Sequence, residues 1–415
     1  MKKIFETISV IGLGYIGLPT AAAFAAKKID VIGVDVDSKT VDIINQGNIH
    51  IVEPGLDTVV HAAVNEGYLR ATTVPEPADA FIVAVPTPFK GDYQPNLDFI
   101  KKASKAIAPV LKKCDLIILE STCPVGATEK MTAWLAQERP DLIFPKDGGD
   151  VSDINIAHCP ERVLPGHIMR ELVENDRIIG GITERCTIRA SELYKIFVEG
   201  ECIQTNARTA ELSKLTENSF RDVNIAFANE LSLVCEKLDI NVWELISLAN
   251  RHPRVNVLQP GPGVGGHCIA VDPWFIVSSA PEESRLIRTA REVNDNKPEV
   301  VISKVLDSIN GIVDPVIACL GLAFKADIDD LRESPAVYIT EKLASVSDAS
   351  IFVVEPNITS LPDSLSKFSN ITLVESEAAL KKADVVVLLV DHTVFKGIDR
   401  SLINTQKIID TRGIW

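Results

Sequence analysis

Cys268 is the side chain of this sequence with the clearest potential for covalent chemistry. It stands near the end of a glycine-dense loop, residues 261–272, and a carboxylate, Asp272, follows it four residues later. Glycine has no Cβ and tolerates positive φ, so such a loop can fold tightly and expose its backbone to a ligand. A thiolate at the end of the loop could attack a carbonyl carbon. The alternative is a turn followed by a structural cysteine, because cysteine is often buried.

A second group of polar side chains follows from a long helical pattern. Residues 207–238 contain neither Gly nor Pro, and their apolar residues recur with helical spacing, which predicts one long helix. Lys214, Asn218 and Arg221 are spaced four and then three residues apart, so they share one face of that helix. A shared face of this kind could belong to a site; the alternative is a solvated stripe on a surface helix.

The first forty residues predict a dinucleotide site. A β-branched run at residues 7–11 precedes Gly12, Gly14 and Gly17, which enclose Tyr15 and Ile16, and an alanine-rich helical stretch follows. This strand, turn and helix can seat a pyrophosphate at a helix N-terminus. The next strand ends on Asp35, which can accept both ribose hydroxyls of NAD and would repel the 2′-phosphate of NADP. A signal peptide is the alternative for the apolar run after Lys3.

Further polar residues follow the predicted parallel strands. Residues 78–86 and 116–119 read as buried strands, and ligands of open α/β sheets bind outside the carboxyl ends of strands. Thr87, Glu120, Ser121 and Thr122 therefore are candidates for the nicotinamide side, although each could be an ordinary loop cap. One more strand, at residues 154–158, leads into a turn with Glu161 and Arg162, whereas residues 146–150 are expected to form a surface loop.

Composition limits the kinds of partner. The 415 residues carry 57 acidic and 42 basic side chains, so a formal net charge of -15 argues against nucleic acid or an anionic membrane as partner. The eight cysteines show no CxxC and no Cys/His ligand spacing, which predicts reduced thiols, a cytoplasmic location and no metal site. Phosphate oxygens must then be held by local clusters, for which Arg is the bidentate choice; these are Arg251, His252 and Arg254, and Arg285, Arg288 and Arg291.

The last hundred residues repeat the pattern of the first hundred. Residues 315–321 give a strand followed by glycine, residues 351–355 a strand that ends on an acid, and residues 383–390 another strand. We therefore expect an α/β protein with two doubly wound Rossmann-like domains, joined by the long helix and a small helical domain. The predicted boundaries are 1–200, 201–300 and 301–415. The second nucleotide-type domain lacks the GxGxxG spacing, so it should bind something other than a dinucleotide, with Lys325 and Arg332 as cationic candidates.

In combination these motifs resemble the nucleotide-sugar 6-dehydrogenases (the UDP-glucose/GDP-mannose 6-dehydrogenase family) over the whole chain. The resemblance is carried by Gly12, Gly14 and Gly17 with Asp35, by the segments 121–126, 160–161 and 214–218, and by the loop from Gly265 through Cys268 to Asp272. It implies oxidation of a sugar C6 alcohol to a carboxylate with two NAD and one water, by a homodimer. The expected substrate is UDP-N-acetyl-D-mannosamine, for a surface polysaccharide such as enterobacterial common antigen.

The resemblance also implies roles for individual residues. Cys268 would hold the aldehyde as a thiohemiacetal and then as a thioester, with Asp272 assisting the thiol and the water. Lys214 and Asn218 would serve the first proton transfer and the oxyanion, and Glu161 the acid–base steps. Whether Lys214, Glu161 or a water with Thr122 takes the first proton stays open. Thr128 and Arg332 would contact the cofactor. The remaining residues implied at the substrate are Arg162, Val163, Arg221, His252, Arg254, Gly265, Lys325 and Arg412 (the last across a dimer interface).

Two departures from the UDP-glucose branch concern the surroundings of the sugar. Pro165 replaces a second glutamate, and Val271 replaces a lysine just before the loop aspartate. They favour a 2-acetamido sugar, with UDP-N-acetylglucosamine and UDP-glucose as alternatives. A single-hydride dehydrogenase of a hydroxy acid would not need Cys268, and a cofactor-sensing binding protein would bind NAD without turnover.

Overall fold

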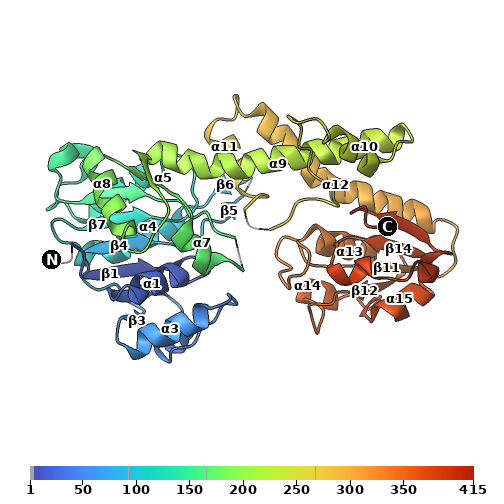
Figure 1. Cartoon of the computed structure of the whole chain (residues 1–415), viewed down its shortest axis with the longest axis horizontal. Helices are drawn as coiled ribbons and strands as arrows, with labels where there is room; N and C mark the ends of the chain where they lie inside the picture. The colour runs from blue at the N-terminus through green and yellow to red at the C-terminus, as the bar shows by residue number, and fades with distance from the viewer. Residues whose placement is uncertain (1–3, 92, 165, 267) are drawn as a thin grey trace. The chain divides into compact units, whose positions relative to one another are not determined.

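The computed structural model describes residues 4–91, 93–164, 166–266 and 268–415. The chain divides into two compact units, Met1–Glu217 and Asn218–Trp415, and each is described by itself. Both are α/β folds with doubly wound sheets, as expected (Figure 1).

The first unit is built on an eight-stranded sheet of order β10-β9-β8-β7-β4-β1-β2-β3. All neighbours are parallel except β8 and β9. In register, Ile8 of β1 lies between Val31 of β2 and Ala80 of β4. The strands are β1 Thr7–Ile11, β2 Asp30–Val34, β3 Leu69–Thr72, β4 Ala80–Val83, β7 Leu116–Leu119, β8 Asn155–His158, β9 Arg177–Gly181 and β10 Cys202–Asn206.

Helices cover both faces of this sheet. The central strands β1, β4 and β7 are short runs of apolar residues that are buried on both sides, as is typical of a parallel sheet. One face packs against α1 (Gly17–Ala26), α2 (Ser38–Asn45), α3 (Leu56–Asn65) and α7 (Ile168–Glu174), and the other against α4 (Asp98–Ile107) and α5 (Ala127–Glu138). Helix α8 (Glu184–Tyr194) packs on β8, β9 and β10. A hairpin of β5 (Phe89–Lys90) and β6 (Gln94–Pro95) and the 3-10 turn η1 (Ala108–Val110) complete the unit. The expected surface loop at 146–150 is wrong, because α6 (Pro145–Gly148) and the 3-10 turn η2 (Gly149–Val151) occupy it.

The long helix is confirmed as α9, Ala207–Lys237, and the boundary between the two units falls within it. In the second unit it is followed by α10 (Val242–Ala249), α11 (Asp272–Ser279) and α12 (Arg285–Ile309). A five-stranded, fully parallel sheet of order β13-β12-β11-β14-β15 completes this unit. Its strands are β11 Val316–Leu320, β12 Ser350–Val354, β13 Ile371–Leu373, β14 Val385–Leu388 and β15 Lys407–Asp410.

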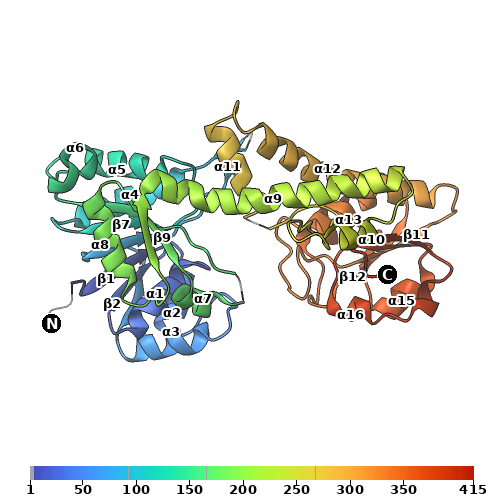
Figure 2. The same ribbon diagram turned by 45° about the horizontal axis from the view of Figure 1, so that its top comes forward.

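The second sheet is also covered on both faces (Figure 2). Helices α12, α13 (Pro335–Val346) and α14 (Asp363–Ser366) pack on one face. Helices α15 (Ser376–Lys382) and α16 (Thr393–Lys396) and the 3-10 turn η3 (Arg400–Ile403) pack on the other. The predicted repeat is visible in the backbone: Gly12 after β1 donates to Val34 at the end of β2, and Gly321 after β11 donates to Val354 at the end of β12, each at 2.8 Å.

A buried polar network joins α9 and α12 inside the second unit. Arg291 is 1% exposed and donates to Asp222 at 2.6 Å, and it also pairs with Asp295. Asn294 donates to Asp222 as well, and it accepts from Asn229. The expectation that Arg291 holds a phosphate is therefore wrong, because its guanidinium serves this network.

None of the helices among the described residues is both long and apolar enough to span a bilayer.

Substitution of Gly17 tests how closely the first turn is packed. A Cβ at Gly17 would lie 1.7 Å from the carbonyl oxygen of Gly12, whereas a Cβ at Gly14 would meet nothing within 4 Å. We expect Gly17→Ala to lower the free energy of unfolding of the first unit by about 3 kcal/mol or more, since backbone must move. Gly14→Ala is the matched control and should change it by less than about 1 kcal/mol. Denaturant titrations measure both, and equal stabilities of the two variants would contradict this packing.

Candidate active site

The glycine loop of the second unit lies where side chains would not fit. A Cβ at Gly265 would be 2.5 Å from the carbonyl oxygen of Glu333 and 2.7 Å from Pro335. At Gly263 it would be 3.0 Å from Pro298 and from Pro335, and at Gly261 2.9 Å from Nη1 of Arg412. The loop therefore passes directly over α12, the start of α13 and the segment that carries Arg412, and three of its glycines are needed for that approach.

Cys268 lies four residues before Asp272, the first residue of α11, in the turn that leads into this helix. Its thiol is exposed, and its carbonyl oxygen accepts the N–H of Asp272 at 2.9 Å. The N-terminus of a helix favours negative charge, which is the form that a nucleophilic thiol must take. His267, the preceding residue, lies outside the described residues.

Two other predicted catalytic residues are in direct contact. The side-chain amide of Asn218 donates to a carboxylate oxygen of Asp272 at 2.5 Å, and both side chains are buried. The second unit thus brings Asn218, Asp272 and the backbone of Cys268 together. Lys214 is half-buried in the first unit, one helical turn before Asn218 on α9, and Arg221 is exposed on the same helix.

The first unit presents the predicted cofactor residues at the carboxyl ends of β1, β2 and β4. Asp35 is half-buried; one of its oxygens accepts the N–H of Leu13 at 2.9 Å and the other that of Asp37 at 3.0 Å. Tyr15 is 39% exposed and Ile16 half-buried in the turn. The hydroxyl of Thr87 donates to the carbonyl of Thr122 at 2.6 Å, so these two predicted residues are neighbours.

Thr128, another predicted cofactor residue, is fully buried at the start of α5. Its N–H and its hydroxyl both donate to Glu211 of α9, at 2.8 and 2.6 Å. Glu211 also accepts the N–H of Gly126, so its carboxylate caps α5. Cys123 and His158 lie close enough to Glu211 for a shared metal ion. Burial lowers the pKa of His158 to about 3, so its ring is neutral. The three hydrogen bonds that Glu211 accepts from Gly126 and Thr128 already account for its buried carboxylate without an ion.

Glu161 belongs to a buried ion-pair cluster that the sequence did not reveal. Arg177, the first residue of β9, donates to Glu161 at 3.1 Å and to Glu120 at 3.4 Å. Glu120 also accepts from Tyr194 at 3.0 Å and from Thr20 at 3.2 Å. Its side chain is fully buried, so the expectation that Glu120 lines the nicotinamide side is wrong. The available signal was an arginine at the start of an otherwise apolar strand, because such a charge must be paired.

Arg162 and Val163 follow Glu161 on a partly exposed turn. The N–H of Arg162 donates to Glu161 at 2.6 Å, and its guanidinium pairs with Glu217 at 2.8 Å. Val163 is half-buried. Pro165, which distinguishes this sequence from the UDP-glucose branch, lies outside the described residues.

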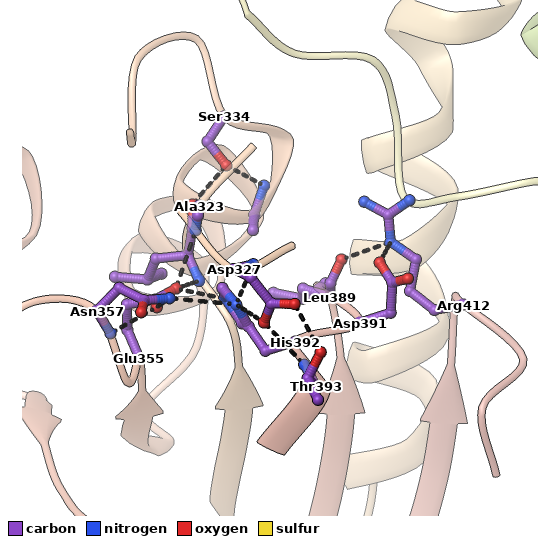
Figure 3. Close-up of polar contacts among 12 residues, drawn as sticks. Ala323, Asp327, Ser334, Glu355, Asn357, Leu389, Asp391, His392, Thr393 and Arg412 are labelled. Carbon is purple, nitrogen blue, oxygen red and sulfur yellow. Dashed lines mark hydrogen bonds and ion pairs between the residues drawn. The ribbon is translucent and has the colours of Figure 1, made fainter. Parts of the chain in front are cut away.

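Of the predicted cations of the second unit, Lys325, Arg332 and Arg412 lie on segments that follow strands of its sheet. Arg412 follows β15 and donates to the carbonyl of Leu389 at 3.0 Å, with Asp391 at 3.7 Å (Figure 3). Lys325 is exposed on the segment after β11, and the exposed Arg332 pairs with Asp330 at 2.6 Å. His252 and Arg254 are exposed before the glycine loop.

Two nucleotide-type folds, one with a complete glycine turn and acid, and a cysteine loop beside the other, define a dinucleotide-dependent dehydrogenase with a second nucleotide-binding domain. Comparison with known families makes this specific. The chain belongs to the UDP-glucose/GDP-mannose dehydrogenase family: its NAD-binding domain matches residues 6–198, its central domain residues 208–296 and its UDP-binding domain residues 318–415. The protein is an NAD-dependent dehydrogenase, and NAD is its cofactor.

Similar proteins extend over nearly the whole chain. The UDP-N-acetyl-D-mannosamine dehydrogenase of Campylobacter jejuni is 69% identical over 94% of this chain and 96% of its own. The NDP-N-acetyl-D-galactosaminuronic acid dehydrogenase of Ralstonia solanacearum is 62% identical over 99% and 96%. Among solved structures, the UDP-N-acetyl-mannosamine dehydrogenase of Staphylococcus aureus is 42% identical, with a TM-score of 0.86 over 98% of this chain and 95% of that one. The corresponding enzyme of Pyrococcus horikoshii is 38% identical, with a TM-score of 0.87 over 99% and 96%.

The cluster around Glu120 predicts a pH dependence of stability. Burial raises the pKa of Glu120 to about 7, well above the usual value of a glutamate. Between about pH 4.5 and pH 7 the folded state then binds more protons than the unfolded state, so this group makes the protein less stable as the pH rises. Glu120→Gln should remove that part of the slope. Denaturant unfolding at several pH values measures it; a variant with the wild-type slope would contradict the assignment.

Proposed function

We propose that this protein oxidises the C6 alcohol of UDP-N-acetyl-D-mannosamine to the carboxylate in two NAD-dependent steps, through a thioester on Cys268. The observation that carries the proposal is Cys268 itself: an exposed thiol that precedes a helix N-terminus, with a hydrogen-bonded Asn218–Asp272 pair at that helix. The substrate is supported by relatives 61–69% identical that carry this activity in their names.

The first turn of the first unit has the features of an NAD-binding site. Gly14 leaves open space at the turn, and Asp35 has accepted only two hydrogen bonds of the roughly four that a carboxylate can take. Gly12, Gly14, Tyr15, Ile16, Gly17 and Asp35 are proposed to hold the dinucleotide, with Thr87 and Thr122 toward its nicotinamide. When bound, NAD accepts the hydride in each of the two oxidations.

The chain's own groups are proposed to act on C6 in order. The alcohol first loses a proton and a hydride and becomes an aldehyde. The sulfur of Cys268 then bonds to C6 and gives a thiohemiacetal, which loses a second hydride and becomes a thioester. Water attacks the thioester, the C–S bond breaks, and the carboxylate and the thiol are released. Asn218 is proposed to hold the developing oxyanion and Asp272 to assist the thiol and the water.

Lys214 is proposed to take the first proton, with Glu161 or a water held by Thr122 as the alternatives. Glu161 is 6% exposed, and its two carboxylate oxygens accept hydrogen bonds from Arg162 and Arg177. This carboxylate is proposed for the later acid–base steps.

UDP is proposed to bind the second unit, with Lys325 at its phosphates and Arg412 as a further contact made across the proposed dimer interface. Arg162, Val163, Arg221, His252, Arg254 and Gly265 are proposed as further substrate-binding residues. Pro165 and Val271 favour the 2-acetamido group. One relative at 62% identity is named for N-acetyl-D-galactosaminuronic acid, so the galacto epimer is the second candidate.

Counting NADH tests the proposal directly. Purified protein should form two NADH for each UDP-N-acetyl-D-mannosamine consumed, and less with UDP-N-acetylgalactosamine, UDP-N-acetylglucosamine and UDP-glucose. Cys268→Ser should lose the complete reaction, since the aldehyde can no longer be held, whereas Cys114→Ser changes another exposed thiol and should keep it. One NADH for each sugar, or full turnover by Cys268→Ser, would refute the thioester.

We further propose a cytoplasmic homodimer that supplies a surface polysaccharide such as enterobacterial common antigen. Phe220, Phe227 and Val234 recur every seven residues on α9 and are 69%, 55% and 47% exposed, an apolar stripe that a second copy could cover. Light scattering should give twice the mass of the chain. Phe227→Asp should yield monomer; a wild-type monomer would overturn the dimer.

A further inference from the structure

The two units have the same backbone conformation and hydrogen bond at the first turn of their nucleotide-type folds. Gly12 and Gly321 have φ of 93° and 92°, and both donate to the last residue of the neighbouring strand. In each unit an acid after that strand accepts N–H groups of the turn: Asp35 accepts Leu13, and Glu355 accepts Leu322 and Ala323 at 2.7 and 3.0 Å. Glu355 thus stands where the ribose-binding acid of a dinucleotide fold stands.

The two carboxylates differ in what they can still accept. Asp35 is half-buried and takes two donors. Glu355 is 5% exposed and takes five, from Leu322, Ala323, His392 and both nitrogens of Asn357. A carboxylate offers about four lone-pair positions, so Glu355 has none left for a ribose diol. Burial opposes its ionisation, but the hydrogen bonds from His392 and the backbone keep the pKa of Glu355 below its usual value.

His392 is one of the side chains that occupy the hydrogen-bonding positions of Glu355. It is fully buried, and its Nε2 lies 3.0 Å from Glu355. Its Nδ1 accepts the N–H of Asp327 at 2.9 Å, so the hydrogen is on Nε2 and is donated to Glu355. The ring thus contacts both neighbours, and Figure 3 shows the imidazole between Glu355 and Asp327.

The bonds of His392 bracket the segment that carries Lys325. Glu355 holds the beginning of the segment through Leu322 and Ala323, and His392 holds its end through Asp327. Thr393, next to His392, adds a hydrogen bond from its hydroxyl to Asp327 at 2.6 Å. The exposed Lys325 lies between these two anchors, so its backbone position depends on them.

We propose that His392 is a positioning and specificity residue of the UDP-sugar site: it closes Glu355 to a ribose and fixes the backbone that presents Lys325. This inference rests on the proposed function. It assigns to the second unit recognition of a nucleotide through its phosphates rather than through a ribose diol on the acid after β12. It also explains why a fold with this turn does not take a second dinucleotide.

Calorimetric binding of UDP and of NAD to the intact protein tests the proposal without turnover. His392→Ala should weaken UDP binding about tenfold, since it removes the hydrogen bond that holds Asp327 and the one that fixes Glu355, the anchor of Leu322 and Ala323. NAD affinity should stay unchanged. His392→Gln keeps a donor for Glu355 and should return UDP affinity to within about threefold of wild type. In turnover, KM for the UDP-sugar should rise in His392→Ala while kcat changes little.

Val394→Ala is the matched control, because this neighbouring side chain is 59% exposed and should not alter either affinity. Unchanged UDP affinity in His392→Ala, with NAD bound normally, would overturn the role of His392 alone. Equal losses of UDP and NAD affinity would also overturn it, since they would mean general destabilisation. Failure of the wild-type protein to bind UDP would instead overturn the proposed function.

Discussion

The close approach of the glycine loop to its neighbours is the constraint on which the rest of the candidate site depends. A Cβ at Gly265 would lie 2.5 Å from the carbonyl oxygen of Glu333 and 2.7 Å from Pro335, which leaves no room for a side chain, and Gly261 lies against the guanidinium of Arg412. Because the backbone itself is packed there, Cys268 at one end of the loop and the segment 324–335 belong to one tightly packed unit. The nucleophile and the residues proposed for UDP therefore need no separate element to align them.

Duplication of a nucleotide-binding fold explains the rest of the arrangement. Both units place a positive-φ glycine after the first strand and an acid after the next, so both form the same turn. The two units differ in how many hydrogen bonds this acid already accepts. Asp35 keeps capacity for a ribose, whereas His392 and Asn357 use up that of Glu355. We propose that the side chains around this carboxylate, together with the missing GxGxxG spacing, distinguish the substrate domain from the cofactor domain.

Local patterns predicted the elements well. The strands predicted from the β-branched runs of β1 and β11 and the helix predicted from the Gly- and Pro-free stretch of α9 are confirmed. Strand burial and helix continuity depend on residues that are close in sequence, so local patterns can predict them. The glycine spacing likewise predicted the first turn. In the candidate site, Asn218 and Asp272 were both named from sequence, and the structure bonds them although 54 residues separate them.

Pairings between distant segments could not be read from the sequence. Arg177 meets Glu120 across 57 residues, Glu211 reaches the start of α5 across 83, and Arg291 meets Asp222 across 69. A charged residue in an apolar stretch indicates that a partner exists, but only the fold tells which one. For this reason Glu120 and Arg291 were wrongly expected at ligands.

The most direct test of the account is whether Cys268 carries the substrate during turnover. Protein mixed with NAD and UDP-N-acetyl-D-mannosamine, quenched in acid within the first turnover and digested, should yield a peptide of Cys268 with the mass of the acylated UDP-sugar, sensitive to hydroxylamine. A peptide that stays unmodified at every quench time, while NADH accumulates at two for each sugar, would contradict covalent catalysis by this cysteine.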